Sequence, residues 1–264
     1  MITRKTPEQI DAMRRAGRLV GHTLSALVET VRPGITLLEL DRLAERTIRD
    51  GGGIPSFLGY HGFPATLCLS PNSWVVHGIP NGYVLSDGDI LSIDCGAIVE
   101  GWHGDAAVTV PVGQVDEAAR RLIETTERAM WAGIAQVRAG NRLSDIGHAV
   151  ERAAAAPGYG VVREYVGHGI GTAMHEEPQV PNYGRPGRGL RLQAGLVLAI
   201  EPMVNEGGPE TRVLDDGWTV VTRDGSRSAH FEHTVAITPT GPEVLTLLDG
   251  AHQEDWLPTA AQRR

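Results

Sequence analysis

The sequence predicts an α/β fold of the α+β kind, in which two similar halves place helices over one antiparallel sheet. A pair of helices joined by a tight turn occurs twice, because the turn VRPG at 31–34 returns as VRAG at 137–140. An apolar segment that ends in a carboxylate also occurs twice, at 88–94 and at 195–201. These two repeats predict a pseudo-two-fold arrangement.

Capping signals and apolar spacing place the first two helices. The first begins at 6–8, TPE, because proline is favoured at the first helical position, and its apolar residues recur at helical spacing up to the turn at 31–34. Thr36 and Glu39 have the spacing of a capping box. The second helix is therefore expected to run from there to the glycines at 51–53.

The second half repeats this order and completes one domain. A long helix is expected over 116–137, and a shorter helix follows through 151–152. The halves cover about 5–110 and 115–240. Because they are nearly equal in length and share one order of elements, residues 1–264 are expected to form a single domain.

Four carboxylates occupy matched positions in the strands of the two halves. Asp94 and Glu201 end the apolar segments. Asp105 and Glu232 begin the strands DAAVTV and EHTVAI that follow, although the second hairpin is longer. A salt bridge or a capped helix start could neutralise any one of them, since an unpaired buried carboxylate costs roughly several kcal/mol. Four such acids in symmetric pairs favour a shared site instead.

Divalent cations would resolve the repulsion among these acids. A turn near 99–100 would bring Asp94 to face Asp105 across neighbouring strands, and the repeat would place the other two acids opposite. Crowded carboxylates raise one another's pKa unless cations lie between them. His168, in the glycine-rich stretch GHGIG, adds an imidazole. This set suits Mn, Fe(II), Co or Zn, and two ions could hold a bridging hydroxide, which predicts a metal-dependent hydrolase.

Composition and charge argue against several other classes. A net charge of −8 disfavours a general nucleic-acid binder, and the arginine-containing run at 185–191 is interpreted as a solvated loop. No apolar run approaches the roughly 20 residues that span a bilayer, and the chain does not start with a secretory signal, so a cytoplasmic protein is expected. Cys68 and Cys95 lack metal-site spacing and are expected to be free thiols.

Four segments resemble the methionine aminopeptidases of type I, a group within peptidase family M24, in their short bacterial form. They are LSIDCGAIVEGWHGDAAVTV, EYVGHGIGTAMHEEPQV, LAIEPM and SAHFEHTVAIT, and the resemblance extends over about residues 5–248. It implies the pita-bread fold and a monomer that removes the initiator Met of nascent polypeptides when the second residue is small. It also implies that a hydroxide bridging two divalent ions (Co, Mn, Fe(II) or Zn) attacks the first peptide bond.

The resemblance implies a role for each residue that matches the metal-binding motifs. Asp94 and Asp105 would bind one ion. His168, Glu201 and Glu232 would complete the pair, with Asp105 and Glu232 bridging the two ions. Glu201 would also relay protons as general base. The implied partner is the N-terminus of a nascent chain, with contact to the ribosome as a further expectation.

Two histidines and an apolar pocket would hold the substrate, again by resemblance. His77 would lie near the substrate amine and the scissile amide, and His175 would hydrogen-bond the substrate carbonyl and steady the oxyanion. The pocket for the Met side chain would be lined by Tyr60, Phe63, Cys68, Met174 and Trp218, with Phe57 nearby. The better-known bacterial relatives tend to have Cys, Tyr and Phe at the positions of Phe57, Phe63 and Met174. The shape of this pocket is therefore expected to differ.

Two other functions fit parts of the same pattern. A prolidase-like peptidase could use the same five metal-binding positions, but such enzymes usually add an N-terminal domain for which this chain is too short. A metal-free protein of the same fold could bind peptides, ribosomes or nucleic acid. Such proteins typically lose metal-binding residues, and all five are present here.

Overall fold

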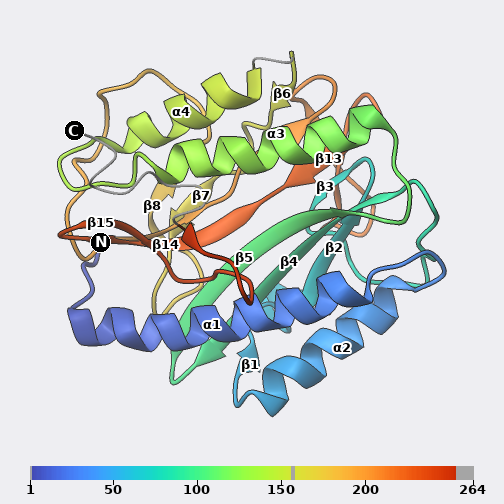
Figure 1. Ribbon diagram of the computed structural model, residues 1–264, viewed down its shortest axis with the longest axis horizontal. Helices are drawn as coiled ribbons and strands as arrows, with labels where there is room; N and C mark the ends of the chain where they lie inside the picture. The colour runs from blue at the N-terminus through green and yellow to red at the C-terminus, as the bar shows by residue number, and fades with distance from the viewer. Residues whose placement is uncertain (1, 156–157, 254–264) are drawn as a thin grey trace.

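The computed structural model describes residues 2–155 and 158–253, and its helices cover one face of a curved antiparallel sheet (Figure 1). The helices of this part of the chain are α1 (Pro7–Thr30), α2 (Leu37–Asp50), α3 (Glu117–Ile134) and α4 (Leu143–Ala155). In Figure 1 the α1/α2 pair and the α3/α4 pair lie on opposite sides of the view, in front of the sheet. This two-fold arrangement of helix pairs confirms the predicted fold.

Capping boxes begin both helices of the first pair. The sequence predicts the box at Thr36, and at Thr6 it predicts the helix start but not the box. The Thr6 hydroxyl accepts from the Gln9 N–H, and the Gln9 side chain accepts from the Thr6 N–H. Thr36 and Glu39 make the same reciprocal bonds at the start of α2. In the second pair, α3 ends at Ile134, so the expected helix over 116–137 is slightly too long.

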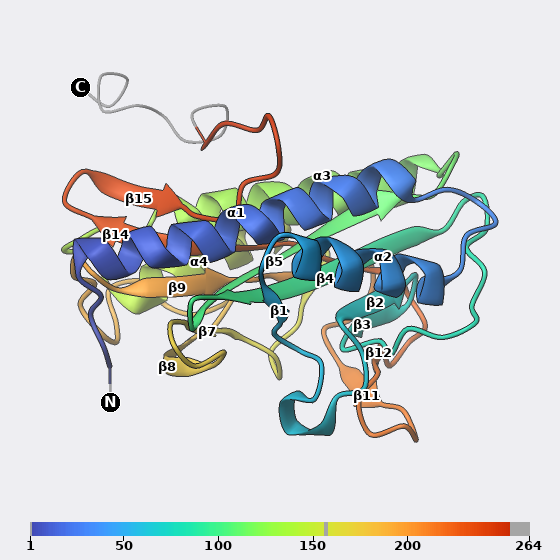
Figure 2. The same cartoon turned by 90° about the horizontal axis from the view of Figure 1, so that it is seen from below.

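The main sheet has nine strands, with the order β1-β4-β5-β14-β9-β7-β8 and with β2 and β15 paired to β4 and β14. Its strands are β1 (Ile54–Pro55), β2 (Leu67–Pro71), β4 (Ile90–Val99), β5 (Trp102–Pro111), β7 (Gly167–Gly169), β8 (Glu176–Val180), β9 (Val197–Ile200), β14 (Glu232–Thr238) and β15 (Gly241–Val244). In the edge-on view of Figure 2, α1 and α3 lie above this sheet. The face opposite the helices is therefore left to loops and short strands.

Two three-stranded sheets extend the structure beyond the main sheet. One has the order β13-β10-β6 and the other has the order β11-β12-β3. Their strands are β3 (Trp74–Val76), β6 (Gly160–Val161), β10 (Met203–Asn205), β11 (Thr211–Val213), β12 (Val220–Thr222) and β13 (Ser228–His230). A short 3₁₀ helix, η1 (Tyr60–Gly62), follows β1, and Figure 2 shows this segment on the same side as β11.

The two halves of the chain meet where β5 pairs with β14. In this antiparallel pair Glu232 lies opposite Ala107 and His233 lies opposite Ala106. The first half supplies the β4/β5 hairpin, and the second half supplies the β9/β14 pair. Strands that carry acidic residues in both halves therefore lie next to each other at the centre of the sheet.

The register corrects two local expectations about the first half. The turn after Val99 forms as expected, but Asp94 pairs with Ala107 while Asp105 pairs with Gly96. The two acids are therefore diagonal neighbours on one face rather than direct partners. Asp94 also lies in the middle of β4 and does not end it, because the apolar residues after it continue to pair with β5 and β1.

Close contact between helix and sheet builds the core. Gly104 of β5 lies against the backbone of α1, where an added Cβ would come within 2.8 Å of the Gly17 nitrogen. This approach buries Leu24 and Leu27 of α1 in the same apolar cluster as β4 and β5 residues. Within residues 2–155 and 158–253, no helix has the length and apolar character needed to cross a membrane.

Candidate metal centre and active site

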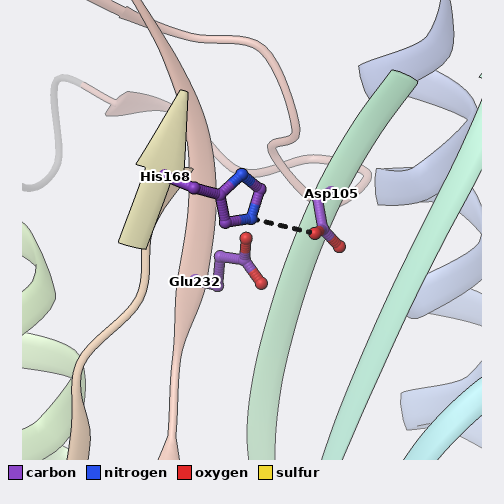
Figure 3. A group of neighbouring side chains, drawn as sticks. All are labelled: Asp105, His168 and Glu232. Atoms are coloured by element: carbon purple, nitrogen blue, oxygen red, sulfur yellow. Dashed lines mark ion pairs between the residues drawn. The ribbon is translucent and has the colours of Figure 1, made fainter. Parts of the chain in front are cut away.

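Carboxylates and an imidazole from both halves converge in one cavity. Ligand atoms of Asp105, His168 and Glu232 all lie within 4.8 Å of one another. Figure 3 shows these three side chains pointing toward one another, with Asp105 and His168 on opposite sides of the group. Nε2 of His168 lies 3.8 Å from Oδ2 of Asp105 and 3.4 Å from Oε1 of Glu201. Asp94 lines the same cavity, so the structure brings together all five side chains that the sequence singled out.

The tautomer of His168 suits a metal ligand. Its Nδ1 lies 2.8 Å from the carbonyl oxygen of Gly169, and a carbonyl can only accept, so Nδ1 carries the proton. The lone pair of Nε2 then faces Asp105 and Glu201. Burial, followed by the charge of His175, lowers the pKa of His168 to about 3, so the ring stays neutral. A neutral imidazole cannot offset the acids, but it can bind a cation together with them.

Burial and mutual repulsion shift the carboxylate pKa values upward. Burial raises the pKa of Asp94 to about 7, although a hydrogen bond with Asp105 lowers it. Burial, then the charges of Glu232 and Asp94, raise the pKa of Asp105 well above its usual value. The pKa of Glu201 and that of Glu232 are raised in the same way, with burial as the first cause. These acids cannot all be ionised together without a compensating positive charge.

Unpaired buried oxygens show that the site fits divalent cations. Asp105 and Glu232 are only 4% and 2% exposed. Oδ1 of Asp94, Oδ1 of Asp105 and Oε1 of Glu232 have no hydrogen-bond partner within the described part of the chain. An orphaned buried carboxylate oxygen is costly, and bound cations would satisfy all three oxygens at once. The donor set of four carboxylates and one imidazole is one that Mn, Fe(II), Co and Zn accept.

An apolar pocket continues from the carboxylates within the same cavity, which has a volume of about 390 Å³. The rings of Phe63 and Trp218 pack edge to face, with their centroids 5.2 Å apart. The cavity contains every pocket residue expected from the sequence, namely Phe57, Tyr60, Phe63, Cys68, Met174 and Trp218. Aromatic and sulfur-containing walls suit an unbranched thioether side chain.

The two histidines expected near the substrate both line this cavity. Nδ1 of His175 lies 2.8 Å from the Tyr60 hydroxyl, and the His175 ring lies 4.4 Å from the His168 ring. The His77 ring meets Tyr165 edge-on at 5.5 Å. Burial, followed by the charge of His175, lowers the pKa of His77 to about 4, and burial, then the charge of His61, lowers the pKa of His175. Both rings are therefore neutral at physiological pH.

Two further histidines, which the sequence analysis did not assign to the site, also lie there. His61 lines the cavity beside Tyr60, with the ring centroids 4.3 Å apart. His230 is buried, and its Nε2 lies 3.9 Å from Oε2 of Glu201. The available signal for His230 was its position two residues before Glu232, because side chains two apart along an extended chain lie on one face.

Fold and site together define a metal-dependent peptidase with the pita-bread fold. The family model described as metallopeptidase family M24 matches residues 11–239. The chain therefore belongs to metallopeptidase family M24. Its similar relatives place it in the methionine aminopeptidase group of that family. It is 56% identical over 248 residues to a methionine aminopeptidase of Clostridium perfringens, covering 94% of this chain and 100% of the relative. It is 51% identical over 254 residues to methionine aminopeptidase 1 of Mycobacterium tuberculosis, covering 94% and 96%.

Solved structures show the same fold. A methionine aminopeptidase from Rickettsia prowazekii superposes with a TM-score of 0.92 at 44% identity, covering 94% of this chain and 100% of that one. A prolidase from Pyrococcus furiosus superposes with a TM-score of 0.76 at 22% identity, covering 93% of this chain and 66% of the prolidase. The prolidase shares the fold alone.

Proposed function

We propose that this protein is a methionyl aminopeptidase that removes the initiator Met from nascent proteins when the second residue is small. One observation carries the proposal: the buried cluster of four carboxylates and His168 opens directly into an apolar pocket of aromatic and sulfur-containing side chains. The cluster suits hydrolysis of an amide, and the pocket suits a Met side chain. The similarity of the chain to relatives named methionine aminopeptidase supports the same substrate, an N-terminal Met.

The proposed metal ligands are the five residues of the cluster. Asp94 and Asp105 would hold one divalent ion, and His168, Glu201 and Glu232 would complete the binding of a pair, with Asp105 and Glu232 contributing to both. The unpaired oxygens and the Nε2 lone pair of His168 support this assignment. When bound, divalent ions activate water at neutral pH and stabilise negative charge on a carbonyl oxygen. Their identity is proposed as Co, Mn, Fe(II) or Zn.

The chain's own residues bind the substrate and move the protons. The apolar pocket holds the Met side chain and so places the first peptide bond beside the carboxylates. His77 contacts the substrate amine and the scissile amide nitrogen, and His175 donates a hydrogen bond to the carbonyl oxygen, where it steadies the oxyanion. Glu201 accepts a proton from the attacking water and passes it to the leaving amine.

The setting of this activity is proposed from the same resemblance. The partner is the free N-terminus of a nascent chain, reached in the cytoplasm by a monomer, with residues 1–264 acting as one domain. Contact with the ribosome would bring the enzyme to its substrate as each chain emerges. The net charge of −8 does not favour binding to nucleic acid in general.

One assay separates the proposed function from its alternatives. The protein is stripped with a chelator, reloaded with Mn, Fe(II) or Co, and given the peptides Met-Ala-Ser, Met-Lys-Ser and Lys-Pro-Ser, with product amino acids measured over time. We expect cleavage of Met-Ala-Ser alone, its loss on chelation and its return with metal. Cleavage of Lys-Pro-Ser would instead identify a prolidase. Absence of cleavage with every metal would identify a binding protein.

A further inference from the structure

We infer that Tyr60 is a positioning residue whose hydroxyl decides which nitrogen of His175 carries the proton. The hydroxyl oxygen of Tyr60 lies 2.8 Å from Nδ1 of His175. The inference rests on the proposed function, in which His175 donates a hydrogen bond to the substrate carbonyl. It adds a role for the phenol that is separate from the role of its ring as a wall of the apolar pocket.

The role proposed for His175 sets the direction of this hydrogen bond, because a phenol hydroxyl can either donate or accept. A neutral imidazole has one N–H and one lone pair, so Nδ1 must accept if Nε2 is to carry a hydrogen. The phenol of Tyr60 can donate that bond. With Nδ1 satisfied in this way, Nε2 of His175 presents an N–H to a carbonyl oxygen, which can only accept. In the opposite tautomer Nε2 would present a lone pair and could not steady an oxyanion.

The segment around η1 holds Tyr60 firmly enough for this task. The backbone N–H of Tyr60 donates to the Phe57 carbonyl, and its own carbonyl accepts from the Phe63 N–H, both at 2.9 Å. Gly59 and Gly62 flank the turn with φ values of 85° and 89°, which L side chains rarely adopt. Burial raises the pKa of Tyr60, so its hydroxyl stays protonated and able to donate.

His175 is confined from its other side. Its ring lies 4.4 Å from the ring of His168, and the next residue, Glu176, is bonded to Lys5 at 2.6 Å. The hydroxyl of Tyr60 is the partner of Nδ1 of His175 within the described residues. Loss of that hydroxyl would therefore leave the His175 ring in place but would no longer favour one tautomer over the other.

Kinetics of Tyr60→Phe test the separation of the two roles. The substitution keeps the aromatic ring and removes only the hydroxyl, so we expect KM for Met-Ala-Ser within about twofold of the wild type and kcat lower by about tenfold or more. His175→Ala should lose about 100-fold or more, since the donor itself is removed. The matched control is Tyr83→Phe, which removes a hydroxyl that bonds Asp89 away from the cavity and should leave kcat unchanged.

A spectroscopic readout tests the pairing without metal or substrate. Long-range ¹H–¹⁵N spectra of histidine-labelled, metal-free protein report the tautomer of each ring, and the signal lost in His175→Ala identifies His175. We expect the Nε2–H form in the wild type and in Tyr83→Phe, and a mixture or the Nδ1–H form in Tyr60→Phe. An unchanged tautomer in Tyr60→Phe, or an unchanged kcat, overturns the inference. A wild type that cleaves no peptide overturns the proposed function alone, because the spectrum still measures the pairing.

Discussion

Glu201 is the residue for which we propose both proton transfer and cation binding. Its Oε1 lies 3.4 Å from Nε2 of His168, its Oε2 lies 3.9 Å from Nε2 of His230, and its backbone carbonyl accepts from the side chain of Asn182 at 3.1 Å. The main chain of Glu201 is thus held by a hydrogen bond, while each of its carboxylate oxygens faces an imidazole nitrogen. A change of charge at this position, without a change of shape, isolates the chemical role of the carboxylate.

Glu201→Gln should fold and lose most of its activity. The amide keeps the shape of the side chain but cannot accept a proton, so we expect kcat/KM to fall by about 100-fold to 10,000-fold. In the metal-free protein the melting temperature should stay equal or rise, because one of four repelling acids is gone. Peptide kinetics and thermal melts check both results, with the exposed Glu117→Gln as the matched control. Near-normal turnover of Glu201→Gln would contradict the assigned role.

At the scale of elements, the connection from β7 to β8 depends on a distant segment. This connection carries Met174 and His175 into the cavity. Immediately after it, Glu176 accepts hydrogen bonds from the Lys5 ammonium at 2.6 Å and the Thr3 hydroxyl at 2.8 Å. The side chain of Lys5 is 4% exposed and that of Glu176 is 14% exposed, so the pair is largely shielded from water. The start of the chain therefore helps to hold one wall of the site.

Lys5→Met should destabilise the protein through this buried pair. Removing one partner leaves the other charge buried, which costs about 3–5 kcal/mol, and the double variant with Glu176→Gln should recover much of that loss. The matched control is Arg15→Met, which breaks the exposed pair with Glu100 and should cost less than about 1 kcal/mol. Urea unfolding measures all three variants. Equal losses for Lys5→Met and Arg15→Met would show that the buried pair contributes little.

At the scale of the whole molecule, the β5/β14 pairing places repelling acids from both halves at the centre of the sheet. Asp105 directly precedes Ala106 and Ala107, the β5 residues that pair with β14, and Glu232 is the first residue of β14. The stability of the whole chain is therefore linked to the ionisation of the cluster and to whatever cation binds there.

The metal-free protein should become less stable as the pH rises above about 7, where the neutral buried histidines no longer oppose the effect of the acids. The folded pKa of Asp94, about 7, lies above its usual value of 3.8. A group of this kind contributes stability that is fully present below pH 3.8 and is lost as the pH rises through about 7. The other three acids shift in the same direction. Melting temperatures from about pH 7 to about pH 9, where histidines are neutral in both the folded and the unfolded chain, should fall without metal and fall much less with excess Mn. Parallel curves would argue against cation binding by the cluster.

Several parts of the fold and the site could be predicted from the sequence because they depend on neighbouring residues. The helix start at Thr6, the capping box at Thr36 and the turn after Val99 require only contacts within a few positions. Asp94 and Asp105 were expected to face each other directly, but they are diagonal neighbours. The prediction was wrong because an apolar run does not show where its strand stops. The approach of His230 to Glu201 was missed for a similar reason, since it depends on the pairing of β13 with β10, where His230 lies opposite Met203.

The sequence by itself determined the helix pairs, the repeat that relates the two halves, and the kinds of side chain that could hold a metal ion. The spacing of apolar residues, helix capping and turn formation depend on residues that are close together in the sequence. They can therefore be recognised from the sequence alone. Only the tertiary structure decided which nitrogen of His168 faces the acids and that Tyr60 bonds His175 across 115 positions of sequence. Such pairings depend on strand register and helix packing, where a shift of one residue would turn every side chain to the other face.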